Sequence, residues 1–197
     1  MTLARSAAQV RRELRGIPQR GLVLGLPTAP ITIVEYGAFG CPQCAAVHRG
    51  VLPQVIARYV RTGKASLEFR GLAGTAPSSA RDLALAAYAA SAQSRGWEFL
   101  QLAYLRSLEA GTTESTTRLA TALGLDAKRL GIDATRPEWL TQVKAAASVA
   151  AVAQFVTFPV FLVRARTQPG QPFIVLTRPE SVKAFADAIA KTGAPGG

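Results

Sequence analysis

Cysteine and histidine are scarce in this sequence, and their scarcity narrows the possible chemistry. The 197 residues include only two cysteines, Cys41 and Cys44, and one histidine, His48. A small secreted scaffold held by disulfides needs more cysteines, spaced more widely. A closed zinc site normally takes four ligands, so this chain would have to add carboxylates or a second chain. The two cysteines therefore favour redox chemistry over a metal site.

Long apolar runs and acidic residues are also scarce. No stretch of eighteen apolar residues occurs, so no membrane span is expected. Asp and Glu total 12 against 23 Lys and Arg, which gives a formal net charge of +11. This charge allows attraction to nucleic acid or anionic membrane surfaces, but the basic residues are scattered and no nucleic-acid motif accompanies them. A solvated basic surface is the better interpretation, and no nucleic-acid partner is expected.

The N-terminal residues lack the apolar segment of a secretory signal. Polar and charged residues occur throughout residues 1–14. We therefore expect a cytoplasmic protein if Met1 is the native start. The alternative, which the same residues fit, is a mature periplasmic or cell-envelope protein whose signal has been removed.

The first part of the chain has the pattern of strand, helix and strand. Residues 31–36 form an apolar, β-branched run typical of a buried strand. Helical spacing follows from Pro42 to about Arg61, with a kink expected at Pro53. A second strand is predicted over 65–72, which completes a βαβ unit of an α/β protein.

The middle of the chain is predicted to be helical, and strands return near its end. Glycine and proline separate four expected helices, at 81–94, 97–110, 113–123 and 138–154. The remaining elements are a hairpin and a last helix, at 160–163, 173–176 and 181–191, with a hairpin turn at 168–172. The element order is therefore βαβ, helices, ββα.

The two cysteines occupy a position that favours reactivity. Cys41 follows a strand and a turn and opens a helix, and Pro42 takes the first helical position, where its missing N–H costs nothing. A sulfur at a helix N-cap accepts backbone N–H bonds at the positive end of the helix dipole, which favours the thiolate. Cys44 lies within disulfide reach and is expected to be more buried. We predict that Cys41 attacks and Cys44 resolves the mixed disulfide. A purely structural disulfide is less favoured, because closing so short a loop adds little conformational stability.

Three further residues are candidates for the site, and each also has an ordinary structural interpretation. Glu35 lies in the apolar strand six residues before Cys41, where it can exchange protons with Cys44 or simply reach water at the strand end. Pro159 precedes a strand and fits an ordinary strand start. His48 lies one helical turn after Cys44 and is expected to be a half-buried helix residue.

These motifs resemble DsbA-type disulfide oxidoreductases. The similarity runs from about residue 22 to 191 and is carried by 31–36, Phe39, the motif Cys41-Pro42-Gln43-Cys44, His48, 97–99, 123–126 and 158–163. It implies a thioredoxin-like fold interrupted by an inserted helical subdomain. The resemblance implies three parts of the chain. They are a basic N-terminal segment (1–21), a thioredoxin-like domain made of residues 22–75 and 156–197, and a helical insertion (76–155).

The resemblance also implies roles for single residues. Cys41 is the nucleophile, Cys44 the resolving cysteine and Glu35 the buried acid beneath them. Substrate is expected to contact four residues around the disulfide: Pro42, Gln43, Phe158 and the cis-proline Pro159. No cofactor is expected besides the redox-active disulfide, and the expected partners are protein or peptide thiols and disulfides together with a redox recycling partner.

Three features depart from the family pattern, one of them the turn Gly37-Ala38-Phe39-Gly40, which replaces a turn that usually contains Asp or Ser. Phe158 stands where Thr or Val usually precedes the cis-proline, and Gln43 stands where strong oxidants carry histidine. These departures concern redox potential and substrate choice, while the predicted reaction remains disulfide exchange by an oxidoreductase. The alternatives left open are a non-enzymatic thioredoxin-fold binding module, a binder of anionic surfaces and a glutathione-linked thiol transferase or isomerase.

Overall fold

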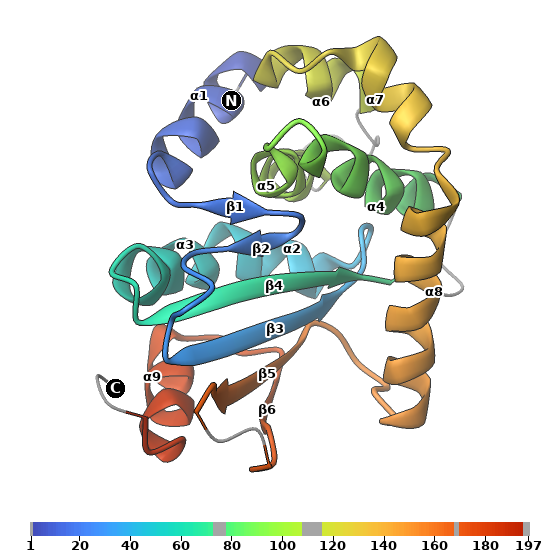
Figure 1. The fold of residues 1–197 in the computed structure, drawn as a ribbon. Helices are drawn as coiled ribbons and strands as arrows, with labels where there is room; N and C mark the ends of the chain where they lie inside the picture. The colour runs from blue at the N-terminus through green and yellow to red at the C-terminus, as the bar shows by residue number, and fades with distance from the viewer. Residues whose placement is uncertain (1, 73–77, 108–115, 168–169, 195–197) are drawn as a thin grey trace.

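The core of the protein is a mixed β-sheet with helices on both faces (Figure 1). The structure is a computed structural model, and it describes residues 2–72, 78–107, 116–167 and 170–194. In this part of the chain, the strand order is β1-β2-β4-β3-β5-β6. The strands are β1 (Gln19–Arg20), β2 (Val23–Leu24), β3 (Ile31–Gly37), β4 (Ala65–Gly71), β5 (Val160–Ala165) and β6 (Ile174–Thr177).

Helices fill the segments between these strands. The N-terminal helix is α1 (Leu3–Leu14), and the crossover from β3 to β4 contains α2 (Pro42–Arg49), α3 (Val51–Val55) and the π-helix η1 (Ile56–Val60). The others are α4 (Ser78–Ser91), α5 (Gly96–Ser107), α6 (Thr116–Leu123), α7 (Ala127–Asp133), α8 (Pro137–Val152) and α9 (Val182–Lys191). None of the helices in the described ranges is long and apolar enough to cross a membrane.

Strand β3 lies at the centre and determines which side chains meet on each face. It pairs with β4 in parallel and with β5 antiparallel, so Glu35 lies opposite Phe69 and Phe161. Side chains alternate along a strand. Ile33 therefore packs in the cluster that includes α2, α3 and α9, while Tyr36 packs in the cluster beneath α8. By the same alternation, Glu35 faces the α2 side.

The helix predicted from Pro42 to about Arg61 is broken, and the break lies before the proline. α2 ends at Arg49, Gly50 separates it from α3, and Pro53 lies inside α3. A proline removes the bond to the carbonyl four residues earlier and clashes with it, which here is the carbonyl of Arg49. The disruption therefore appears three residues upstream of Pro53.

Three elements of the fold differ from the prediction. α7 was not predicted, and the short strands β1 and β2 were not recognised before β3. α1 packs on α5 and α6, and β1 joins the sheet edge, so segment 1–21 contacts both the helices and the sheet. Residues 108–115 and 168–169 lie outside the described residues, so the ends of two predicted helices and part of the 168–172 turn are not described.

Two glycines test how tightly the inserted helices pack. A Cβ on Gly96, where α5 begins, would lie 2.8 Å from Leu22 Cδ2 and Ser91 Cβ and 3.0 Å from the Gly21 oxygen. A Cβ on Gly131 in α7 would meet nothing within 4 Å. We expect Gly96→Ala to lower the free energy of unfolding by about 1–3 kcal/mol. Gly131→Ala should raise it by up to about 1 kcal/mol, because alanine favours helix. Urea unfolding of both variants measures the pair, and equal effects would contradict the packing.

Candidate active site

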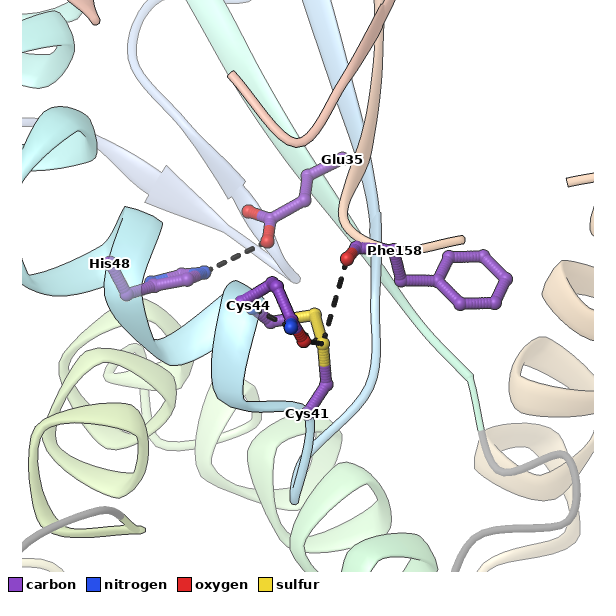
Figure 2. The surroundings of a disulfide bond; sticks show 6 residues. Glu35, Cys41, Cys44, His48 and Phe158 are labelled. Carbon is purple, nitrogen blue, oxygen red and sulfur yellow. Dashed lines mark hydrogen bonds and ion pairs between the residues drawn. A yellow bond between two sulfur atoms is a disulfide. The ribbon is translucent and has the colours of Figure 1, made fainter. Parts of the chain in front are cut away.

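Cys41 and Cys44 form a disulfide at the start of α2 (Figure 2). Their Cα atoms are 5.3 Å apart, and Pro42 takes the first helical turn. Cys41 is the N-cap residue, and its Sγ accepts the backbone N–H of Cys44 at 3.2 Å. Cys41 is half-buried whereas Cys44 is 0% exposed. Only one sulfur of the pair is therefore open to another molecule.

The loop before β5 lies against the exposed side of the disulfide. The Phe158–Pro159 peptide bond is cis, as the resemblance implied. The Phe158 carbonyl oxygen lies 3.7 Å from Cys41 Sγ, across 117 positions of sequence. Figure 2 shows this oxygen directed at the sulfur, with the Phe158 ring turned away. Pro42 and Gln43 are exposed beside the same sulfur. The structure thus brings Phe158, Pro159 and the start of α2 together.

Glu35 does not reach water, and its carboxyl contacts the side chain of His48. The carboxyl is fully buried, and its Oε1 lies 2.9 Å from His48 Nε2. His48 was expected to be half-buried, which is wrong: it is also 0% exposed. Its other ring nitrogen, Nδ1, lies 2.7 Å from Gln101 Oε1 on α5. Both ring nitrogens are therefore engaged with other side chains.

Aromatic side chains enclose the buried ring of His48. The Tyr104 ring stacks on the His48 ring with centroids 3.9 Å apart, and Phe69 meets the same ring edge-on. Burial, and then the negative charge of Glu35, raise the pKa of Tyr104 well above its usual value. Tyr104 therefore keeps its hydroxyl proton at neutral pH.

Gly37 leaves room for this arrangement. A Cβ at position 37 would lie 2.9 Å from Glu35 Oε1 and 3.0 Å from both Phe69 and the Tyr104 hydroxyl. Any larger residue would displace the carboxyl or an aromatic ring. The glycine at the end of β3 is thus needed for close approach.

Sequence reasoning did not identify Gln101 and Tyr104 as members of the site. Both lie on α5, three residues apart and hence on one face of that helix. The resemblance included 97–99 on the same helix but assigned no role to Gln101 or Tyr104, and their shared partner His48 lies more than fifty residues earlier in the chain. For His48, the spacing of one turn from Cys44 was the available signal.

Comparison with known proteins gives one family and several similar structures. A family model described as thioredoxin matches residues 19–186. No curated protein sequence matches the chain. A double variant of α-DsbA1 from Wolbachia pipientis is 21% identical with a TM-score of 0.74, covering 98% of this chain and 96% of its own. Oxidised BdbD from Bacillus subtilis is 18% identical to this chain, with a TM-score of 0.71. DsbA2 from Pseudomonas aeruginosa is 21% identical, with a TM-score of 0.68. Each of these two matches covers 90% of this chain and 96% of the other chain.

The difference in exposure between the two sulfurs predicts a difference in reactivity. When the reduced protein meets limiting iodoacetamide, we expect carbamidomethylation of Cys41 and protection of Cys44, because burial excludes the reagent and the helix N-terminus favours the Cys41 thiolate. Fragmentation of the peptide that carries both residues locates the label. Denatured protein serves as the control and should lose the preference. Earlier labelling of Cys44 in the folded protein would contradict the assignment.

Proposed function

The chain belongs to the thioredoxin family, and from this premise we propose that it exchanges disulfides with protein substrates through Cys41 and Cys44. Its α/β fold with inserted helices is that of DsbA structures, so the predicted fold class is confirmed. One observation carries the proposal. The disulfide caps α2 with Cys41 accessible, Cys44 buried and a cis-proline loop beside the accessible sulfur.

The oxidation of a substrate proceeds in two displacements. A substrate thiolate attacks Cys41 Sγ, the Cys41–Cys44 bond breaks, and Cys44 leaves with the electron pair as a thiolate. A second substrate thiolate then attacks the substrate sulfur of the mixed disulfide, and Cys41 leaves as a thiolate. The substrate loses two electrons and two protons, and the enzyme gains both as its dithiol. Reduction of a substrate disulfide is the reverse sequence.

The surroundings of each sulfur suit its part in this reaction. Cys41 is stabilised as a leaving thiolate by the Cys44 N–H and the N-terminus of α2. Cys44 is buried on the face of α2 that also carries His48, and Glu35 binds His48 from β3. We propose that Glu35 supplies the proton that a buried Cys44 thiolate needs.

The substrate is expected to dock along the loop that precedes β5. The Phe158 carbonyl faces Cys41, and exposed Pro42 and Gln43 lie beside it. An extended peptide near this carbonyl can donate its backbone N–H while presenting a cysteine sulfur to Cys41. We propose that four residues, Pro42, Gln43, Phe158 and Pro159, bind substrate mainly through its backbone, which suits a range of proteins.

Location and partners are inferred from this activity. The cytoplasmic location expected from the N-terminal residues has no support. Catalysed disulfide formation belongs to oxidising compartments such as the periplasm, so we propose a site of action in the cell envelope. A recycling partner that restores the disulfide is required by stoichiometry, because each turnover leaves the enzyme reduced.

Trapping of the mixed disulfide tests the proposed function. Wild-type protein should accelerate thiol loss from a reduced, unfolded protein and the reduction of insulin by dithiothreitol. Cys41→Ser should abolish both reactions, whereas Cys44→Ser should accumulate a covalent substrate complex that a reductant dissolves. A protein that binds the unfolded chain but shows neither activity nor complex would be a binding module. Activity confined to glutathione disulfides would identify a thiol transferase.

The reduction potential of the pair is expected to be intermediate. The side-chain amide of Gln43 carries no charge, and it is its oxygen, Oε1, that lies 4.0 Å from Cys41 Sγ, where it can accept from a thiol but cannot donate to a thiolate. A neutral group stabilises the thiolate less than an imidazolium does. We therefore expect a potential between those of DsbA and thioredoxin, about −120 and −270 mV. Gln43→His should make the potential less negative, as measured in glutathione buffers, and an unchanged or more negative value would contradict the argument.

A further inference from the structure

Gln101 determines which nitrogen of the His48 ring carries a hydrogen. Its Nε2 lies 2.7 Å from the backbone oxygen of His48 and donates to it, because a carbonyl oxygen only accepts. This bond turns the amide oxygen Oε1 toward Nδ1 of the same residue, also at 2.7 Å. An amide oxygen likewise only accepts, so Nδ1 must donate. The ring hydrogen of neutral His48 is therefore on Nδ1, and Nε2 is left for Glu35.

The contact between His48 Nε2 and Glu35 Oε1 then needs one proton. Without it, a ring lone pair would face a carboxylate at 2.9 Å, with no hydrogen bond and an uncompensated buried charge. With it, the pair is either carboxylic acid with imidazole or carboxylate with imidazolium. The net charge is zero in both arrangements, which suits two residues that are each 0% exposed.

We propose that His48 and Gln101 are positioning residues that keep this proton on the Glu35–His48 pair, so that the pair, rather than Glu35 alone, exchanges protons with Cys44. The inference rests on the proposed function. Cys44 and His48 lie one turn apart on the same face of α2, and Glu35 lies beneath that face. When Cys44 leaves as a thiolate, the proton of the pair passes to its sulfur. When Cys44 attacks a mixed disulfide, its thiol returns that proton to the pair.

Apart from Cys44, the described side chains named here around the pair carry no charge. α5 contributes Tyr104, whose raised pKa keeps it protonated, and the neutral amide of Gln101. β4 and β5 place Phe69 and Phe161 beside Glu35. α2 contributes Cys44 itself. The charge of the pair therefore depends on the hydrogen bonds to His48, which Gln101 controls.

The ring can be observed directly, because His48 is the only histidine in the sequence. Full-length oxidised protein labelled with ¹⁵N-histidine should give one ring system by NMR, with the hydrogen retained on Nδ1 across neutral pH. Gln101→Met should lose this preference, since methionine fills the space but cannot accept from Nδ1. A neutral wild-type ring with its hydrogen on Nε2 would overturn the proposal, whatever the activity of the protein.

The kinetic consequence is measured with Ellman's reagent, a chromogenic aromatic disulfide. Reduced protein releases one coloured thiolate when Cys41 attacks and a second when Cys44 resolves the mixed disulfide. Gln101→Met and Glu35→Gln should slow the second release by about tenfold or more and alter its pH profile, while the first release is unchanged. Gln54→Met is the matched control, because Gln54 also donates its amide to a backbone oxygen, at 3.0 Å from Gly50, but at an exposed site.

The outcomes separate this inference from the proposed function. A folded Gln101→Met whose second release keeps the wild-type rate and pH profile would overturn the positioning role while leaving disulfide exchange intact. Absence of exchange in the wild-type protein would refute the proposed function, and the NMR experiment would still decide the state of the ring. Circular dichroism verifies that each variant is folded.

Discussion

The buried contact between His48 and Glu35 ties the active-site helix to the sheet. Glu35 lies on the central strand β3, His48 on α2, and Gln101 extends the same set of hydrogen bonds to α5. Three elements are therefore joined by polar groups that have no access to water. Because an unpaired buried polar group is costly, this set strongly favours one placement of α2 over the sheet. The position of Cys44, one turn from His48, follows from that placement.

The helices between β4 and β5 contribute to the site at both of their ends. α5 supplies Gln101 and the aromatic ring of Tyr104, which together cover His48. α8 leads into the loop that carries Phe158 and its carbonyl oxygen to Cys41. The insertion therefore forms part of the walls of the site, and changes within it are expected to reach the chemistry of the disulfide.

The two sulfurs differ in surroundings although only two residues separate them. Cys41 combines partial exposure, a backbone donor and the positive end of α2. Cys44 is buried, and we propose that the Glu35–His48 pair near it holds a proton. In the proposed reaction, a partly exposed sulfur at a helix N-terminus and a buried sulfur with a nearby proton source give the cysteine pair a direction of attack. This asymmetry underlies the proposed exchange reaction.

Local sequence determined the features whose partners lie close along the chain. The strand over 31–36, the N-cap position of Cys41 and the burial of Cys44 depend on neighbours within a few residues, so patterns of apolar residues and Pro42 were sufficient. The approach of Phe158 to Cys41 was expected only through a family resemblance. Tertiary structure alone decided the full burial of His48, the choice of Gln101 as its partner and the stacking of Tyr104. These depend on α5 packing against α2, and a helix carries no local signal of which distant helix will cover its face.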